Sequence, residues 1–523
     1  MVSAVLFITF FVLLVLNVPI SICLGLSSAA AILYSGTSLT IVATNIYSGI
    51  SKFLLLAIPF FVLSGNIMAK AGISTRLIRF VDTCVGHRKG GIANVCIIVA
   101  CFFGAISGSG PATVAALGAV LIPAMVERGG FSAPFSTALM ATASSIAIVI
   151  PPSIAFVVYA SITGVSIGDM FMAGIVPGIL MGLALIVVVM LEVRKNHVVP
   201  SNVQKASAKE RLDAFKDAFW GFLMPVIILG GIYGGIFTPT EAAAVSVVYG
   251  LFVGMVIYKE VKLKDLWDIL IDSAKTTGGI MLIVACASLF SFVCTRFGIS
   301  AAASQLLAKV AGNQFTFLLI CNVIFLIAGC FIDANSAMYI FIPIMLPVCK
   351  QLGYNVIAFG IMATVNLAIG QVTPPVGVNL FVAIGVKLKN GLQVTLQQIS
   401  RAVVSMVVAS IAVLLLITYI PVISTFLPAA LGSAAAVENG TTTGGDSGTT
   451  ATDNDDFNTI EDYSDLDWPE MTWNFTCSTT ETSTWAQAGR KFGELMEQAT
   501  GGKIKVEVYA ADQLTGGNQS EGI

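Results

Sequence analysis

The stretch SSIAIVIPPSIAFVVYA, residues Ser144–Ala160, places two adjacent prolines, Pro151 and Pro152, in the middle of an apolar segment. A proline in a helix interior costs about 3 kcal/mol or more, because it removes a hydrogen bond and clashes with the preceding turn. A second apolar segment, LAIGQVTPPVGVNLFVA at Leu367–Ala383, carries a double proline in the same place. Because the double proline recurs at a matching position, we predict two broken helices rather than two ordinary kinks.

The composition indicates whether these broken helices lie in water or in a membrane. Of the 523 residues, 56% are hydrophobic and 11% are charged, and the mean hydropathy is +0.90. Soluble domains carry about 25% charged residues. Apolar runs of about 20 residues, enough to cross a hydrocarbon core of about 30 Å, recur up to Leu427. The chain is therefore predicted to be an all-α polytopic membrane protein. The N-terminal apolar run lacks a preceding basic region, so we expect it to be structure rather than a signal peptide.

The same sequence argues against several classes of function. The net charge of −2 gives no reason to expect nucleic acid as a partner. The ten cysteines form no C-x-x-C pair, and the two histidines lie in basic stretches outside the apolar runs. Motifs for phosphate-binding loops, zinc hydrolases and serine hydrolases do not occur in the sequence. We therefore expect no enzyme, no cofactor and no transition-metal site.

The apolar region divides into two halves with the same order of elements. Each half has a membrane span, a short amphipathic arm, a helix–break–helix unit, a double-proline helix and a final span. Beyond Leu427 the chain becomes acidic and rich in Gly, Ser and Thr, and it ends in a strand–helix–strand pattern. The predicted domains are a first inverted repeat, a cytoplasmic segment, a second inverted repeat, an acidic flexible linker and a short α/β fragment, at residues 1–192, 193–216, 217–427, 428–471 and 472–523.

The helix–break–helix units are interpreted as re-entrant hairpins. Their arms are about 15 residues long, which is short for a full crossing, and their tips are polar: SGSGP at Ser107–Pro111 and DANSA at Asp333–Ala337. The positive-inside rule places the basic clusters at Gly86–Gly91, Tyr258–Asp265 and Val386–Gly391 in the cytoplasm. The first hairpin then enters from the cytoplasm and the second from outside, with about ten crossings and both termini external. Opposed repeats with interrupted helices indicate a secondary transporter.

The four breaks are the candidate binding site. Irregular backbone is tolerated in a membrane only where it faces protein or a polar cavity, so we expect the breaks to lie together. Free carbonyls and hydroxyls suit a hard cation such as Na⁺, and helix N-termini attract anions. The expected cation ligands are Ser107, Gly108, Ser109, Ser144, Ser145, Asp333, Asn335, Gly370 and Thr373. The expected substrate contacts are Gly110, Pro111, Ser153, Ser336 and Asn379. The helix-breaking residues are Pro151, Pro152, Pro374 and Pro375.

Several of these residues have a second interpretation. Asp333 lies between the apolar arms of the second hairpin, where it can contact a cation or cap the helix that follows. The SGSGP tip can form a site or can simply allow close helix packing. Hydroxyls such as those of Thr142 and Ser144 often bond to their own helix. The first double proline is expected to free the carbonyls of Ala147–Ile150 for a cation and to place Ser153 at a helix start.

Several motifs carry a resemblance to a known family. GAISGSGPATVAALGAVLIPAM, IPPSIAFVVYA, FTPTEAAAVSVVYG and VTPPVGVNLFVA resemble the large membrane subunit of TRAP (tripartite ATP-independent periplasmic) transporters. The resemblance implies an elevator-type transporter in the bacterial inner membrane that takes up a carboxylate or sialic acid with Na⁺ as coupling ion. It also implies two partners, a four-helix small membrane subunit and a periplasmic solute-binding protein, in addition to membrane lipid.

The C-terminal stretch TWAQAGRKFGELMEQATGGKIKVEVYAADQL resembles the start of that binding protein. It is too short to bury a core, so we expect a truncated or vestigial fusion that binds no substrate. The main hypothesis is Na⁺-coupled import of a small organic anion. One alternative is a channel or exporter of the same superfamily that needs no binding protein. A membrane enzyme or scaffold is a second alternative, and it would need a His/Asp/Ser constellation within the membrane that the sequence lacks.

Overall fold

The computed structural model describes residues 1–16, 18–195, 205–386, 394–431, 471–477, 484–500 and 502–510. The chain divides into two compact units, Met1–Thr441 and Thr442–Ile523. Four predicted features lie partly outside the described residues: the acidic linker at 428–471, the cytoplasmic segment at 193–216, the basic cluster at Val386–Gly391, and the C-terminal fragment at 472–523.

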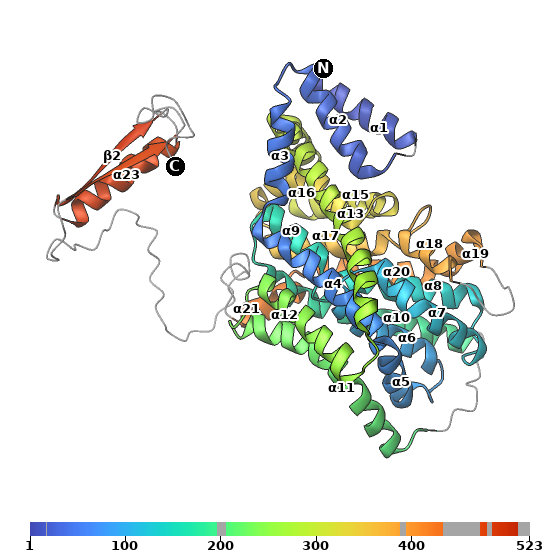
Figure 1. The fold of residues 1–523 in the computed structure, drawn as a ribbon. Coiled ribbons are helices and arrows are strands. Elements are labelled where there is room, and N and C mark those ends of the chain that lie inside the picture. The colour runs from blue at the N-terminus through green and yellow to red at the C-terminus, as the bar shows by residue number, and fades with distance from the viewer. Residues whose placement is uncertain are drawn as a thin grey trace, which may run out of the picture. The chain divides into compact units, whose positions relative to one another are not determined.

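The first unit begins with helices that pack along one long helix, α13, at Leu263–Arg296 (Figure 1). α2, α3 and α4 all contact α13, and α1 pairs with α2. The Lys52 ammonium, just before η1, donates a 2.7 Å hydrogen bond to the carbonyl of Ser161. Partial burial lowers the pKa of this lysine. The elements are α1 (Val2–Val15), α2 (Ile20–Tyr34), α3 (Thr40–Ile50), η1 (Phe53–Leu56) and α4 (Ala57–Lys70).

The first half continues in the predicted order of arm, hairpin, broken helix and long helix. The hairpin arms, α6 and α7, have 17 and 18 residues rather than about 15, because each helix continues to the two-residue tip. The broken helix stops at Ile148 and resumes at Ile154. The elements are α5 (Ile73–Val85), α6 (Gly91–Ser107), α7 (Gly110–Glu127), α8 (Ala133–Ser145), η2 (Ile146–Ile148), α9 (Ile154–Thr163) and α10 (Ile167–Lys195).

The second half repeats this order after two further helices. A hairpin of α15 and α16 turns at residues 332–333, and the second broken helix is interrupted between Gly370 and Val378. The elements are α11 (Ala208–Tyr233), α12 (Pro239–Leu251), the π-helical η3 (Phe252–Ile257), α13, α14 (Ile299–Ala311), α15 (Gln314–Phe331), α16 (Ala334–Gln351), α17 (Val356–Gly370), α18 (Val378–Ile384), α19 (Leu396–Ala402), α20 (Val404–Tyr419) and α21 (Val422–Ala430).

Seven helices of the described chain are long and apolar enough to cross a membrane. The number is eight if α19 and α20, which meet at 47°, form one span. The first unit is thus a multi-pass helical membrane protein. The expected number of about ten crossings stays a prediction, because the additional crossings would use shorter helices such as α1 and α2.

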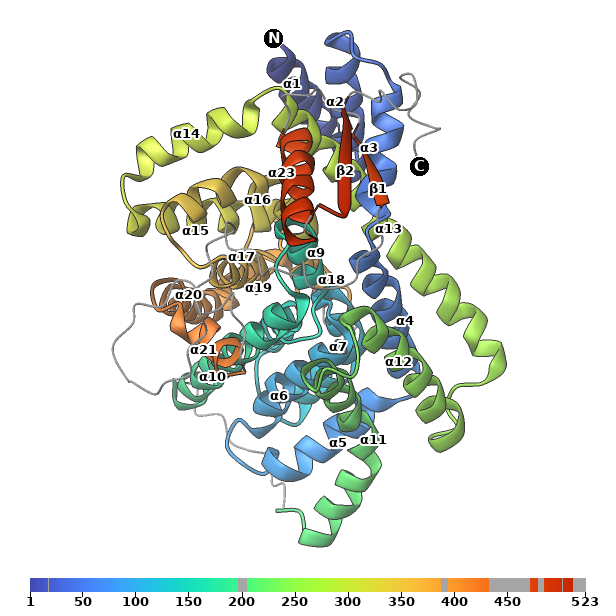
Figure 2. The same ribbon diagram turned by 90° about the vertical axis from the view of Figure 1, so that its left-hand side faces the viewer.

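The amphipathic arm α5 lies beside α11 (Figures 1 and 2). Arg76 pairs with Glu260 at 2.6 Å and lies 3.9 Å from the centre of the Tyr258 ring, and Arg79 pairs with Asp217 at 3.0 Å. At the other end of the arm, Asp82 pairs with Arg128 of the first hairpin at 2.8 Å. The arm therefore joins α11 and the segment before α13 to the end of the hairpin, a role that the sequence did not suggest.

Each hairpin packs backbone to backbone against the broken helix of its own half. A Cβ added at Gly370 would lie 2.5 Å from the backbone of Gly329 in α15. In the first half, a Cβ added at Gly104 of α6 would lie 2.7 Å from the Cα of Ala147. Both contacts exclude any side chain, so the hairpins and breaks form two matched pairs.

The Gly370–Gly329 contact gives a test of this packing. Gly370→Ala should lower the free energy of unfolding by about 1–3 kcal/mol, because an added methyl group overpacks a backbone contact. The control is Gly278→Ala on α13, where no atom lies within 4 Å of the added Cβ. Alanine favours a helix over glycine, so Gly278→Ala should be neutral or stabilising. Thermal unfolding in detergent measures both, and equal melting temperatures would contradict the contact.

The second unit contains two strands and a helix: β1 (Met471–Cys477), α23 (Thr484–Ala499) and β2 (Ile504–Ala510). The strands pair in parallel, with Met471 opposite Ile504, and α23 connects them and packs on β2. The described part of this unit thus has the order strand, helix, strand.

Candidate functional site

The tip of the first hairpin consists of Gly108 and Ser109, which follow Ser107 at the end of α6. Gly108 has φ +60°, and a Cβ there would lie 2.9 Å from the carbonyl oxygen of Pro152, so glycine fits both the turn and the contact with the first break. The hydroxyls of Ser107 and Thr113 are 2.9 Å apart, and Thr113 also donates to the carbonyl of Ser109 at 2.8 Å. The Ser107 hydroxyl thus holds the tip in shape, while Ser109 makes no side-chain cap bond.

The tip of the second hairpin is organised by Asp333. Its carboxylate accepts hydrogen bonds from the backbone N–H groups of Asn335 and Ser336, at 3.0 and 3.1 Å, and from the Ser336 hydroxyl at 2.5 Å. Asp333 is therefore the N-cap of α16, which was one of the two interpretations of this residue. Ser336, expected to contact the substrate, uses its hydroxyl for this cap.

The two breaks are also closed by local hydrogen bonds. Ser153 caps α9 by accepting from the backbone N–H of Phe156, and its hydroxyl donates to the carbonyl of Ile148 across the break at 2.5 Å. In the second half, the N–H of Gly377 donates to the carbonyl of Cys330 in the second hairpin at 3.3 Å. The Pro151–Pro152 and Pro374–Pro375 peptide bonds are cis.

Both hairpin tips and the first break line one cavity of about 350 Å³. Three helices begin at its wall: α7 with Gly110 and Pro111, α9 with Ile154, and α16 with Ala334. Each helix N-terminus carries roughly half a positive charge, which favours anions. Further lining comes from Gln371 and, on α13, from Lys275, Thr276, Gly279, Ile280 and Ile283. The positive groups of the wall are thus Lys275 and the starts of α7 and α9, while the carboxylate of Asp333 offsets the partial charge at the start of α16.

Buried amide oxygens supply a second kind of contact. The side-chain oxygens of Asn335, Gln371 and Asn379 are buried and have no hydrogen-bond partner among the described residues. A Cβ built at Gly110 would lie 2.9 Å from the Gln371 oxygen and 3.0 Å from the Asn379 oxygen, so both amides reach the start of α7. A buried unpaired carbonyl is costly, and hard cations prefer such oxygens. These three oxygens are therefore the best candidates for a cation.

The residues expected from the sequence fall into three groups. Gly108, Ser109, Gly110, Pro111, Asp333 and Asn335 line the cavity. Ser107, Ser153, Ser336 and Asn379 lie beside it and support the tips and helix starts. Outside the lining are Ser144, Ser145, Gly370 and Thr373.

The hydroxyls outside the lining bond to their own helices. Ser144 donates to the carbonyl of Met140 and Ser145 to that of Thr142, both at 2.8 Å, and Thr373 donates to Ile369 at 2.7 Å. Of the double prolines, Pro152 contacts the first tip, and Pro374 and Pro375 lie in the second break.

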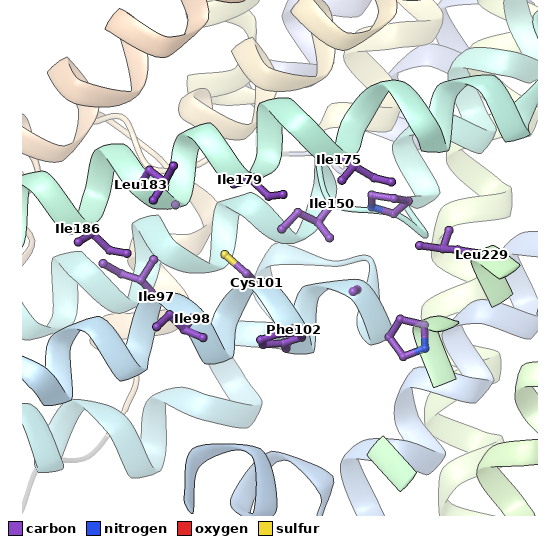
Figure 3. Close-up of a pocket in the computed structure, with 14 residues that line it drawn as sticks. Ile97, Ile98, Cys101, Phe102, Ile150, Ile175, Ile179, Leu183, Ile186 and Leu229 are labelled. Carbon is purple, nitrogen blue, oxygen red and sulfur yellow. The ribbon is translucent and has the colours of Figure 1, made fainter. Parts of the chain in front are cut away.

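A second cavity, of about 390 Å³, lies between α6, α10 and α11 (Figure 3). Pro151 lines it together with apolar side chains such as Ile97, Phe102 and Leu229, and with Cys101. It offers no charged or amide side chain among its lining residues, so it is not suited to an anion.

Sequence reasoning missed Lys275, Thr276 and Gln371. Gln371 lies inside the predicted break GQVTPP, and the polarity of that break was the available signal. Lys275 precedes the apolar run of α13, but only the fold brings it to the tips. A further unpredicted cluster joins α15, α17 and α20 in the core: Asn366 donates to Asn322 at 2.7 Å, and Asn322 donates to Thr418 at 3.4 Å.

The hairpins, broken helices and electropositive cavity are typical of a membrane transporter. A solved structure with a similar fold is the Alcanivorax borkumensis YdaH transporter, with a TM-score of 0.53 and 15% identity over 75% of this chain and 88% of that one. The sequence profile of the tripartite ATP-independent periplasmic transporter DctM component matches residues 7–423. The chain therefore belongs to the DctM family of TRAP transporter large permeases, which confirms the resemblance seen in the sequence.

Curated relatives carry several substrate names. The C4-dicarboxylate TRAP transporter large permease DctM of Rhodobacter capsulatus is 38% identical over 80% of this chain and 97% of its own length. The isethionate TRAP transporter permease DctMQ of Oleidesulfovibrio alaskensis is 42% identical over 81% of this chain and 66% of its own length. The sialic acid permease SiaM of Vibrio cholerae is 34% identical over 76% of this chain and 92% of its own length.

The role of Asp333 as a cap can be tested by two substitutions. Asp333→Ala should lower the free energy of unfolding by about 0.5–2 kcal/mol, whereas Asp333→Asn should change it little, because asparagine is an equally good N-cap. Asp213→Ala, at an exposed position on α11, is the control. Thermal unfolding in detergent measures all three. If Asp333→Asn destabilised the protein as much as Asp333→Ala, the negative charge rather than the cap would hold the tip.

Proposed function

We propose that the protein is the large permease subunit of a TRAP transporter that imports a small organic anion by symport with Na⁺. The observation that carries the proposal is the cavity at the hairpin tips, where three helix N-termini and Lys275 line about 350 Å³. A cavity of this volume suits a small ligand. The partial positive charge at the helix N-termini favours an anion, so the cavity needs few basic side chains to bind one.

The substrate class follows from this wall and from the relatives. The N–H groups at the starts of α7 and α9 suit an acid group, whereas those of Asn335 and Ser336 in α16 already bind the Asp333 carboxylate; the isoleucines on the wall suit an apolar body. The relatives are named for C4-dicarboxylate, isethionate and sialic acid, which are all small organic anions. A carboxylate or sugar acid is therefore the proposed cargo.

The amide oxygens of Asn335, Gln371 and Asn379 support Na⁺ as the coupling ion. They lie beside the anion cavity, so that a bound cation would strengthen anion binding and the anion would strengthen cation binding. The backbone carbonyls and hydroxyls at the tips, including Ser109, complete the proposed coordination. Binding of each ion then depends on the other, which is the requirement for symport.

The proposed movement is of the elevator type. The two hairpins and the two broken helices form the moving part, joined by the backbone contacts at Gly104 and Gly370. The long helix α13 and the helices packed on it, α2, α3 and α4, form the scaffold. The two halves, built in the same order, are proposed to be inverted repeats.

The proposed partners are a four-helix small membrane subunit and a periplasmic solute-binding protein, in the bacterial inner membrane with both termini outside. Exposed apolar side chains on α1 to α3, among them Ile8, Phe11 and Tyr47, suit lipid or that membrane subunit. The second unit would be the start of a fused binding protein. The alternative is a transporter of the same superfamily that works without a binding protein. The two are distinguished by whether uptake requires a periplasmic solute-binding protein.

Uptake into proteoliposomes tests the proposal. The chain, reconstituted with its partner subunits, should accumulate radiolabelled succinate, isethionate or N-acetylneuraminate only when an inward Na⁺ gradient is present. Gln371→Leu should reduce this uptake by at least about tenfold, because it removes a buried amide that can bind charge.

The matched control for Gln371→Leu is Gln351→Leu, an exposed position at the end of α16 that lies outside the cavity. It should transport like the wild type. Accumulation that is equal with and without the Na⁺ gradient would overturn the coupling.

A further inference from the structure

Lys275 differs from the rest of the cavity wall because of the element that carries it. Lys275 belongs to α13, as do the lining residues Thr276, Gly279, Ile280 and Ile283, and it is the charged one among them, whereas the rest of the lining belongs to the hairpins, to the first broken helix or to the second break. α13 packs along α2, α3 and α4 and also contacts α16 of the second hairpin, without being part of either hairpin or either break (Figure 1). The cavity therefore combines a wall from the proposed moving part with a charged side chain from the proposed scaffold.

The Lys275 ammonium is available to a ligand. It forms an ion pair with Asp272, one turn earlier, at a distance of 3.8 Å, and the two side chains are 74% and 71% exposed. Such exposed pairs contribute little to stability. Gln371, which lines the same cavity, is 94% buried, yet its side-chain oxygen has no hydrogen-bond partner among the described residues. The cavity lining thus combines an unsatisfied amide oxygen with an exposed ammonium group.

The position of Lys275 along α13 indicates the side of the membrane on which it acts. It lies eleven residues after Lys264, or about 16 Å along the helix, and twenty-one residues before Arg296, or about 31 Å. Lys259, Lys262 and Lys264 form the basic cluster that the positive-inside rule places in the cytoplasm. Lys275 is therefore nearer to the cytoplasmic end.

We propose that Lys275 is a stationary counter-charge that binds the acid group of the substrate only while the cavity faces the cytoplasm. This inference rests on the proposed function. When the hairpins and breaks carry the anion away from α13, their own N-termini go with it but Lys275 stays behind. The lysine therefore strengthens anion binding in one state alone, and it sets the affinity on the cytoplasmic side without changing the affinity on the external side.

Membrane vesicles of both orientations test this role. Entry of radiolabelled succinate, isethionate or N-acetylneuraminate, whichever the wild type transports, is measured in inside-out and right-side-out vesicles that contain the full complex. Lys275→Gln should raise the half-saturating concentration about tenfold in inside-out vesicles, since a close charge pair is lost. In right-side-out vesicles, the change should be less than twofold. Lys275→Arg should behave like the wild type.

Two further variants test whether the effect of Lys275→Gln comes from the lost charge or from damage to the fold. Asp272→Asn removes the acid next to Lys275, so the half-saturating concentration should fall in inside-out vesicles, in the direction opposite to Lys275→Gln. Lys264→Gln removes an exposed lysine of the same helix outside the cavity and should have no effect. The melting temperature of Lys275→Gln should equal that of the wild type, because the side chain is mostly exposed.

Each outcome of this experiment has a distinct meaning. Equal shifts in both vesicle orientations, or a Lys275→Gln variant that matches Lys264→Gln, would overturn the stationary counter-charge and leave the proposed transport intact. A wild type that transports none of the three anions would overturn the proposed function itself. A tenfold shift confined to inside-out vesicles supports the proposal.

Discussion

The structure depends on the requirement that backbone N–H and C=O groups within a membrane find partners inside the protein. Four interruptions of helices would each leave such groups unpaired in lipid. Here the hairpins close the interruptions, through direct backbone contacts at Gly104 and Gly370 and through caps at Ser153 and Asp333. The breaks can therefore exist only as a packed group, and this explains why segments far apart in the sequence meet at one cavity.

The same requirement determines which polar groups remain for a ligand. Short polar side chains mostly bond to groups close to them in the sequence: the Asp333 carboxylate accepts from the backbone of Asn335 and Ser336, the Ser336 hydroxyl donates to Asp333, and Ser144 in α8 donates to its own helix. Amide side chains are longer and carry both a donor and an acceptor. Asn379 donates to the carbonyl of Ala141 while its oxygen stays unpaired. Amides can thus support the fold and face a site at once, which hydroxyls at these positions do not do.

The sequence was sufficient to predict the elements but not all of the site. Helix breaks follow from local rules for proline and glycine, so Pro151 and Gly108 could be located without a structure. Apolar runs and basic clusters likewise indicated the arms and the hairpins. The serines at the end of α8 were misleading, because a hydroxyl in an apolar core bonds to the preceding turn. Lys275 was missed since its place at the cavity depends on how α13 packs against both tips, which no local pattern encodes.

The arm α5 holds three partly exposed ion pairs at the expected cytoplasmic edge of the protein: one to α11, one to the segment before α13 and one to the end of the first hairpin. Pairs of this kind are individually weak, because water weakens the attraction between exposed charges, and salt weakens it further. In the proposed elevator movement, they could open and re-form without a large barrier. The ionic strength of the cytosol would then influence the rate of transport. At low salt the ion pairs of α5 would be stronger and the arm stiffer, and at high salt the pairs would be weaker and the arm more mobile.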